Sequence, residues 1–259
     1  MTAGRTAAIT GERVSTPAAG FNPTFQRHVA AYRLCAPLLP GGRVLDLGCG
    51  VGHSYHELAP RVSVGVDVQP LALAGQERET HVADMRRLPF EAGSFASVIS
   101  VQSIEHVPDP ELVVAEAARV LDPAGRAVFV TPNRLTFGPP GEIIDPYHYI
   151  EFDATELRAL CGGSFGSVEV LGMHGSDRYN ALVDAERRAL ERMLALDPLR
   201  LRRMVPRRAR QRLYDWRLRR ERNTPRPGAL EIGPEDFTLS AEQLEEALDL
   251  FAVCDEPCP

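Results

Sequence analysis

The stretch Arg-Val-Leu-Asp-Leu-Gly-Cys-Gly-Val-Gly, residues 43–52, decides how this chain is expected to fold. Its apolar part, Val44–Leu47, predicts a short buried strand. The three glycines that follow allow the backbone to turn sharply, with no Cβ in the way. A second strand-like run, Val62–Val66, ends in the acid Asp67. Because ligands of open α/β sheets lie outside the carboxyl ends of the strands, these two strand ends predict a ligand site.

Strand-like and helix-like segments alternate on both sides of this stretch. Short apolar runs are followed by segments in which apolar residues recur at helical spacing. This order is typical of βαβ units and predicts an α/β fold with a parallel sheet covered by helices on both faces. The expected strands are 44–47, 62–66, 96–101, 127–131, 168–171 and 248–254, the last returning to the sheet. The expected helices are 25–39, 52–58, 70–77, 110–121 and 155–160, the last with Asp153 as its N-cap.

Length and composition indicate a globular protein with one α/β domain and an accessory element. The 259 residues carry a net charge of −6, and 44% of them are hydrophobic. No apolar run approaches the roughly 18 residues of a membrane helix, and Met1–Gly20 lacks the apolar segment of a secretory signal. The five cysteines are scattered without a Cys-x-x-Cys pair. We therefore expect a cytoplasmic protein with no membrane span.

The glycine-rich turn fits one nucleotide-like ligand better than another. Its pattern is Asp-x-Gly-x-Gly-x-Gly, with Gly52 two residues after Gly50, whereas the dinucleotide fingerprint places its third glycine three residues after the second. No pyrophosphate is therefore indicated. Asp67 suits the two hydroxyls of a ribose, and Asp46 is placed to organise the turn and to accept from an ammonium group. These features favour S-adenosylmethionine over NAD.

The segment Val44–Gly52 resembles the first motif of class I S-adenosylmethionine-dependent methyltransferases, and Asp67 resembles their ribose-binding acid. In this family Asp84 would face the adenine amino group and Met85 the adenine ring. The resemblance runs from about residue 30 to 172 and implies a Rossmann-like, seven-stranded sheet, with S-adenosylhomocysteine as the product. The cofactor-binding residues that it implies are Asp46, Gly48, Cys49, Gly50, Gly52, Asp67, Val68, Ala83, Asp84, Met85, Val101 and Gln102.

The loop after the fourth expected strand carries the pair Glu105–His106. In methyltransferases of the ubiquinone and small-RNA 2′-O types, a Glu-x-x-Glu-His loop and a later histidine hold magnesium. Here Gln102 occupies the first position, the pair is intact, and His148 is the later histidine. The resemblance thus implies an Mg²⁺ site at Glu105, His106 and His148, which would lower the pKa of an acceptor hydroxyl. Similar loops without a metal also occur, in which the histidine packs against the loop.

A second motif is Thr131-Pro132-Asn133-Arg134 followed by the segment 145–152. Together with Thr10-Gly11-Glu12-Arg13 near the start of the chain, this layout resembles actinobacterial sugar O-methyltransferases, such as those acting on methylmannose polysaccharides or on mycofactocin oligosaccharides. It implies a saccharide or other small-molecule acceptor, with His148 as general base and Glu105 and His106 as further catalytic residues. The N-terminal lid residues that it implies are Glu12, Arg13, His28 and Tyr32.

Two other functions stay open at this point. The first is methylation of a quinone, polyketide or other natural-product hydroxyl, for which a flatter acceptor would call for aromatic residues. The second is a non-catalytic module that binds the cofactor or RNA and methylates nothing.

One segment differs from the rest in charge. Residues 200–226 contain twelve arginines against two acids, Asp215 and Glu221. The chain is expected to divide into an N-terminal lid and helix at 1–40, a cofactor-binding core at 41–175, a helical insertion at 176–235 that includes this segment, and a C-terminal strand at 236–259.

The arginine-rich segment has three possible uses. Its arginines fall at helical spacing around an apolar stripe, which favours a solvated cap that covers the acceptor groove or forms homodimer contacts. They would also suit an anionic or phosphorylated acceptor. With Tyr214 and Trp216 interleaved, they resemble an RNA-binding surface, although the negative net charge of the chain argues against nucleic acid.

Overall fold

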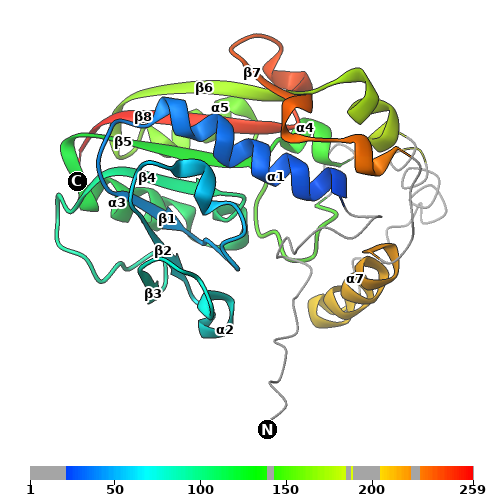
Figure 1. The fold of residues 1–259 in the computed structure, drawn as a ribbon, viewed down its shortest axis with the longest axis horizontal. Helices are drawn as coiled ribbons and strands as arrows, with labels where there is room; N and C mark the ends of the chain where they lie inside the picture. Colours follow the sequence, from blue (N-terminus) through cyan, green and yellow to red (C-terminus); the bar gives the residue numbers. More distant parts are fainter. Residues whose placement is uncertain (1–21, 139–142, 185–187, 189–204, 223–227, 259) are drawn as a thin grey trace, which may run out of the picture.

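The computed structural model describes residues 22–138, 143–184, 188, 205–222 and 228–258. A sheet of eight strands runs through these residues (Figure 1). The strands are β1 (Val44–Leu47), β2 (Ser63–Asp67), β3 (Thr80–Val82), β4 (Phe95–Val101), β5 (Leu121–Pro132), β6 (Phe165–Gly175), β7 (Phe237–Ser240) and β8 (Asp249–Pro257).

The strand order is β3–β2–β1–β4–β5–β8–β6–β7. Strands β3, β2, β1, β4 and β5 are parallel, whereas β8 is antiparallel to both β5 and β6. The chain winds outward from β1 to β3 and then returns to the other side of β1 as β4. This reversal is the topological switch point at which α/β sheets bind ligands, so β1 and β4 mark where the site lies.

The predicted Rossmann-like α/β fold is confirmed, and the sheet has one strand more than the seven expected. The eighth strand is β7, which pairs with β6 at the edge. Neither β7 nor β3 was predicted as a strand. Both are short, and β3 is half-buried to exposed along its length, so neither has the apolar run that marks a buried strand.

Helices cover both faces of the sheet. They are α1 (Asn22–Cys35), α2 (Pro70–Leu73), α3 (Pro110–Val120), α4 (Arg134–Phe137), α5 (Ala154–Cys161) and α7 (Arg207–Arg222). Short 3₁₀ turns lie at Ala36–Leu38, Tyr55–Leu58, Ile104–His106, Ala229–Glu231, Pro234–Asp236 and Leu244–Glu246. Helix α1 crosses one face, as Figure 1 shows, and α3 and α5 pack on the other.

Side chains of each central strand alternate between two apolar clusters. In β4, Val98 belongs to the cluster under α3 and α5, and the next residue, Ile99, belongs to the cluster under α1. In β5, Phe129 and Val130 divide in the same way. This alternation follows from the two-residue period of a strand, and it fixes the register that places the strand ends together.

The helices agree with the sequence at most positions and differ at two. Asp153 caps α5, as predicted, through a capping box with Glu156. The helix expected at 52–58 is only the 3₁₀ turn Tyr55–Leu58. The helix expected at 70–77 ends at Leu73, because Gly75 takes a left-handed conformation with φ +85°.

Part of the helical insertion predicted at 176–235 lies outside the described residues, namely 185–187, 189–204 and 223–227. Its arginine-rich helix α7 is present, as predicted. Among the described residues, none of the helices combines the length and apolar character that crossing a membrane requires.

Candidate functional site

The glycine-rich turn after β1 has the backbone shape that its sequence predicts. Gly48, Gly50 and Gly52 have φ values of +68°, +53° and +69°, a region that side chains disfavour. A Cβ on Gly48 would also lie 2.5 Å from the Cβ of Ser103. Glycine at position 48 is therefore required twice, by conformation and by the close approach of the loop after β4.

Asp67, at the end of β2, holds this turn in place. Its Oδ2 accepts from the backbone N–H of Gly50 at 3.0 Å, and its Oδ1 accepts from that of Gln69 at 2.8 Å. The side chain is buried, but it also lines the cavity described next. One carboxylate thus joins the two strand ends that the sequence singled out.

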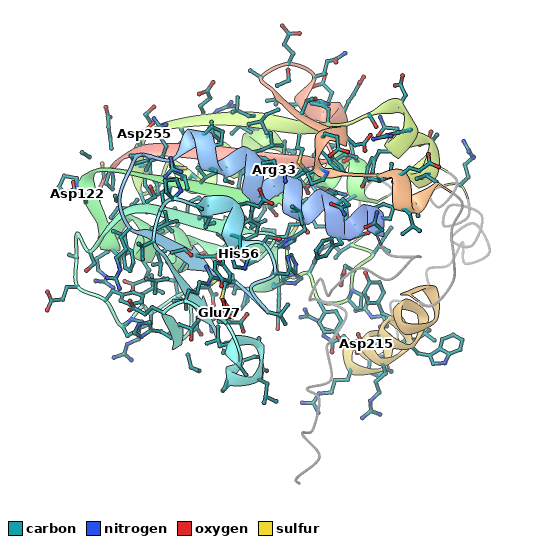
Figure 2. The ribbon with its side chains drawn as sticks, in the orientation of Figure 1. Arg33, His56, Glu77, Asp122, Asp215 and Asp255 are labelled. Atoms are coloured by element: carbon teal, nitrogen blue, oxygen red, sulfur yellow. The ribbon has the colours of Figure 1, made fainter. Side chains whose placement is uncertain are left out.

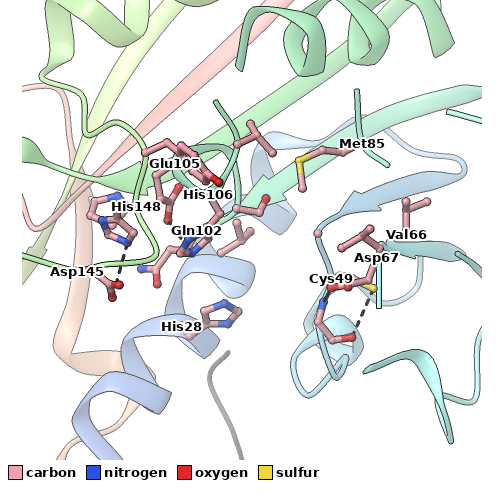
Figure 3. Close-up of a pocket in the computed structure, with 18 of the residues that line it drawn as sticks. His28, Cys49, Val66, Asp67, Met85, Gln102, Glu105, His106, Asp145 and His148 are labelled. Atoms are coloured by element: carbon pink, nitrogen blue, oxygen red, sulfur yellow. Dashed lines mark hydrogen bonds and ion pairs between the residues drawn. The ribbon is translucent and has the colours of Figure 1, made fainter. Parts of the chain in front are cut away.

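A cavity of about 420 Å³ lies at the carboxyl ends of β1, β2 and β4 (Figure 3). This volume is typical of a small-molecule site. One half of the cavity is formed by the glycine turn and Asp67, and the other half by Glu105, His106 and His148. Of the implied cofactor residues, those that line the cavity are Gly48, Cys49, Gly50, Asp67, Val68, Ala83, Asp84, Met85, Val101 and Gln102.

Asp46 and Gly52 do not line the cavity. Asp46 is fully buried beneath the turn, where it accepts from the Tyr32 hydroxyl at 3.0 Å and from Arg78 Nη2 at 2.8 Å. Burial raises the pKa of Asp46, although the Arg78 guanidinium opposes that shift. Each of its oxygens accepts a hydrogen bond beneath the turn, so Asp46 organises the turn as the sequence predicts, and its expected contact with an ammonium group stays a prediction.

Two residues of this support were not predicted. Gln76 Nε2 donates to the carbonyl of Gly50 at 2.9 Å, and Arg78 Nε donates to Gln76 Oε1 at 2.9 Å. The Arg78 guanidinium also lies 4.4 Å from the Tyr55 ring centroid. No local motif marks these side chains, because they reach the turn from a loop between β2 and β3.

The remaining cofactor-side residues differ in exposure. Burial raises the pKa of the Cys49 thiol to about 12, so this side chain is neutral and fills space. Val68 is exposed at the cavity rim, with 61% of its surface accessible. Asp84 lines the cavity while its carboxylate pairs with Arg86 at 2.7 Å, and its expected contact with an adenine amino group stays a prediction.

Gln102, the residue after β4, has an unusual backbone. Its φ of +48° is rare for a residue with a side chain. Its Nε2 donates to Asp249 Oδ1 at 3.2 Å, and Arg27 of α1 donates to the same carboxylate at 2.6 and 2.7 Å. This buried network ties α1, β4 and β8 together beside the cavity.

The half of the cavity formed by Glu105, His106 and His148 contains a cluster of two imidazoles and a carboxylate. We call it the acceptor half, because the sequence predicts the acceptor there, and we call the other half the cofactor half. One atom of each of Glu105, His106 and His148 that could bind a metal ion lies within 4.8 Å of the other two. Glu105 is almost fully buried, and its Oε2 accepts from the Thr131 hydroxyl at 3.0 Å. Its Oε1 has no hydrogen-bond partner within the described part of the chain and lies 3.9 Å from His106 Nε2.

His148 is held by a neighbouring carboxylate. Its Nδ1 donates to Glu151 Oε1 at 2.8 Å, which leaves Nε2 facing Asp145 Oδ2 at 4.0 Å. Burial lowers the pKa of His148, but the Glu151 hydrogen bond and the charges of Glu105 and Asp145 raise it, and the net shift is upward. His106 is oriented similarly, because its Nδ1 donates to the Tyr147 carbonyl at 3.3 Å.

The comparisons with known proteins agree with this geometry. A family model described as a methyltransferase domain matches residues 45–129. A probable S-adenosylmethionine-dependent methyltransferase of Mycolicibacterium smegmatis is 34% identical over 178 residues, which cover 65% of this chain and 69% of the relative. The chain belongs to the S-adenosylmethionine-dependent methyltransferase family.

Two other relatives match less of this chain. A probable S-adenosylmethionine-dependent methyltransferase of Mycobacterium tuberculosis is 34% identical over 64% of this chain, which spans 65% of that protein's length. A ubiquinone biosynthesis O-methyltransferase of Hahella chejuensis is 42% identical, over 37% of this chain and 45% of its own. The similarity to the ubiquinone biosynthesis O-methyltransferase is confined to part of this chain.

Solved structures show the fold of this chain and leave its acceptor open. A Thermotoga maritima protein described as a possible histamine N-methyltransferase superposes with a TM-score of 0.60, at 15% identity over 91% of this chain and 92% of its own. A [4+2]-cyclase superposes with a TM-score of 0.54, at 17% identity over 90% and 82%. Because the fold carries such different chemistry, the acceptor has to be argued from the site.

The half of the cavity around His148 includes residues that the sequence did not assign. Asp145 and Tyr149 line the cavity next to His148, and Tyr214 reaches it from α7. The first two stand in the motif around His148, whereas nothing local marks Tyr214. Of the expected lid residues, His28 lines the cavity, as Figure 3 shows, and Tyr32 contacts Asp46 instead. Glu12 and Arg13 lie outside the described residues.

Proposed function

We propose that this chain transfers the methyl group of S-adenosylmethionine to a hydroxyl of a saccharide, with His148 as the general base. One observation carries the proposal: the glycine turn with Asp67 and the cluster around His148 line the same cavity. A cofactor held on the first half would present its methyl group toward the second. Methyl transfer of this kind needs an aligned acceptor and, for a hydroxyl, removal of a proton.

The contacts of His148 suit proton removal. Because Nδ1 donates to Glu151, the lone pair of the neutral imidazole is on Nε2, the atom nearest the Asp145 carboxylate. A carboxylate behind the imidazole also stabilises the cation that forms when the proton is taken, as in other histidine–carboxylate pairs. An acceptor hydroxyl beside Nε2 would therefore lose its proton to a base already fixed in orientation.

The polarity of the acceptor half supports a polyhydroxylated acceptor. Side chains that line it offer carboxylates at Glu105 and Asp145 and an amide at Gln102, besides the two imidazoles. Such groups pair with several hydroxyls at once, which is how a polar site discriminates strongly between acceptors. Phe137, Tyr149 and Tyr214 supply aromatic surface at the same time.

The cluster also fits a divalent cation. Glu105 Oε1 is buried and has no hydrogen-bond partner among the described residues. The His106 and His148 imidazoles both donate from Nδ1, so the Nε2 atom of each is available as a metal ligand. As an alternative to proton removal by His148, we propose that Glu105, His106 and His148 would hold such an ion. The Nε2 lone pair of His148 would then bind the ion, which would lower the pKa of a bound hydroxyl. Two nitrogen donors favour manganese or zinc over the magnesium that the sequence resemblance implies.

A phenolic acceptor is the second candidate. The observation that favours it is the local similarity to a ubiquinone biosynthesis O-methyltransferase. A phenol ionises more readily than a sugar hydroxyl, so methylation of a phenol would depend less on His148.

Incubation with methyl-labelled S-adenosylmethionine separates the candidates. The panel pairs mono- and oligosaccharides with phenols, and each reaction is run with and without EDTA. Label in saccharides, lost in His148→Ala, supports the proposal, whereas label confined to phenols favours the second candidate. Loss of label with EDTA and its return with manganese or zinc supports the cation, and unchanged label with no bound metal by elemental analysis removes it.

A further inference from the structure

Helix α7 docks on the loop that carries His148 through two crossed tyrosine–aspartate pairs. Tyr214 on α7 donates its hydroxyl to Asp145 Oδ2 of the loop at 2.8 Å. Tyr147 of the loop donates its hydroxyl to both carboxylate oxygens of Asp215 on α7, at 2.9 and 2.8 Å. Each segment thus supplies one donor and one acceptor. Figure 2 shows Asp215 on the side of α7 that faces the rest of the molecule.

Arg207, at the start of α7, binds the same loop. Its Nε donates to the Pro146 carbonyl at 2.8 Å and its Nη2 to the Tyr147 carbonyl at 3.0 Å. Its guanidinium also lies 3.7 Å from the centre of the Tyr149 ring, close enough for a cation–π interaction. The Arg207 side chain therefore contacts three residues of the loop, Pro146, Tyr147 and Tyr149.

The attachment of α7 is mainly polar. Among the described side chains of α7, none belongs to the two buried apolar clusters of the fold. Leu213 and Trp216 expose 65% and 59% of their surface. Because hydrogen bonds are directional and apolar contacts are not, this interface fixes the orientation of the loop as well as its position.

Asp145 connects this interface to His148. Its Oδ2 accepts from Tyr214 and lies 4.0 Å from His148 Nε2, while its Oδ1 accepts from the Tyr147 N–H at 2.8 Å. Its carbonyl accepts from the His148 N–H at 3.2 Å. The Tyr214 hydroxyl therefore binds the carboxylate oxygen nearest the imidazole, and without it the Asp145 carboxylate is free to rotate into the space beside Nε2.

We propose that Tyr214 is a positioning residue for methyl transfer: from α7 it holds the Asp145 carboxylate off His148 Nε2, and with Tyr147, Asp215 and Arg207 it sets the acceptor wall of the cavity. The proposal rests on the function proposed above for His148. It gives the arginine-rich insertion a use within the active site, since Tyr214 itself lines the cavity.

The test compares Tyr214→Phe, Tyr147→Phe and their double variant with Arg212→Gln, an exposed position of the same helix. Three quantities are measured: kcat and acceptor KM, the Kd of S-adenosylhomocysteine by calorimetry, and backbone hydrogen exchange at residues 147–149. Their N–H groups bond to Asp145 and Glu105, so their exchange reports on the loop whatever the acceptor is. Trp216, the one tryptophan of the chain, adds a fluorescence signal on α7 itself.

Tyr214→Phe is expected to lower kcat about tenfold, since a hydrogen bond to a charged group is lost, with the cofactor-product Kd unchanged. The double variant is expected to exchange residues 147–149 about tenfold faster. In an Asp145→Asn background, Tyr214→Phe should have no further effect on kcat, because it acts through that carboxylate. A purely structural role for Tyr214 would give additive losses.

Two outcomes overturn the inference. Exchange and kcat in Tyr214→Phe equal to those of Arg212→Gln would show that the crossed pairs position nothing, even if the wild type methylates saccharides. Additive losses with Asp145→Asn would remove the route through Asp145. Faster exchange in the double variant, with no saccharide methylated by the wild type, would support the docking of α7 and remove the proposed function instead.

Discussion

The cofactor half and the acceptor half of the cavity differ in the groups that form them, backbone in the first and side chains in the second. The cofactor half is mostly backbone, a glycine turn fixed by left-handed conformations and by N–H groups that bond to Asp67. The acceptor half is mostly side chains, brought together from the loop after β4, the loop around His148, and α7. A turn binds any ligand whose shape matches the backbone, whereas a side-chain cluster is specific for one chemistry. The first half therefore identifies the family and the second decides the acceptor.

The largest effect is expected when the acceptor half loses its base. His148→Ala should lower kcat by about 10²- to 10⁴-fold, the usual contribution of a positioned general base. The Kd of S-adenosylhomocysteine should stay within about twofold of the wild type, because no cofactor-side contact is removed. Both quantities come from steady-state kinetics and calorimetry on the same preparation.

His56→Ala is the matched control for this prediction. His56 is exposed on the 3₁₀ turn after the glycine loop (Figure 2), so its removal should leave kcat and Kd unchanged. A His148→Ala variant with wild-type kcat would exclude His148 from the reaction. Equal losses of kcat and cofactor affinity would show that the two halves of the cavity do not act separately.

The reverse experiment weakens the cofactor half alone. Asp67→Asn should raise the Kd of S-adenosylhomocysteine about 10- to 100-fold, since it weakens the charge-assisted hydrogen bonds from the Gly50 and Gln69 N–H groups and those expected from the ribose hydroxyls. At saturating cofactor, kcat should change much less. Glu77→Gln, an exposed carboxylate nearby, is the control. If Asp67→Asn bound the product as tightly as this control, the ribose-binding role of Asp67 would be wrong.

The same contrast explains what the sequence could and could not predict. The glycine turn and Asp67 were found because the residues that shape them are adjacent in the chain or end neighbouring strands. Tyr214 and Asp145 are 69 residues apart, and only the folded chain places them together. The pairing of Asp46 with Arg78 was missed for the same reason, because Arg78 comes from a distant loop. Strand β3 was missed because a short edge strand needs no apolar run.

The pH dependence of methyl transfer tests the acceptor half in the unmodified protein, with the cofactor half unchanged. The pKa of His148 is raised above 6.5, and the base must be neutral, so kcat/KM should rise with pH through that pKa. Below it, kcat/KM should fall about tenfold per pH unit. Glu151→Gln removes the hydrogen-bonded charge that raises this pKa, and should move the acidic limb to lower pH. If the acidic limb of the Glu151→Gln profile did not move, a group other than His148 would be responsible for it.

The smallest effect concerns the attachment of the insertion, which brings α7 to the acceptor half. Asp236 accepts from Ser176 and Arg178, at one end of the insertion, and from the Gly233 N–H at the other. The hydrogen bond from Arg178 holds the pKa of Asp236 at about 2, below its ordinary 3.8. This stabilisation is therefore present above the unfolded pKa and is lost as the pH falls toward 2.

Asp236→Asn should lower the free energy of unfolding by about 1 kcal/mol at pH 7, a value reduced by solvent screening because Arg178 is half-exposed. The difference should shrink when the thermal unfolding is repeated near pH 3. Asp255→Asn, in a surface pair with Arg126, should cost less than about 0.5 kcal/mol at either pH. If both variants lost the same stability, Asp236 would be one more surface charge, and the end of the insertion would be held by other contacts, such as the hydrogen bonds from Asn22 Nδ2 to the Ala229 and Ile232 carbonyls.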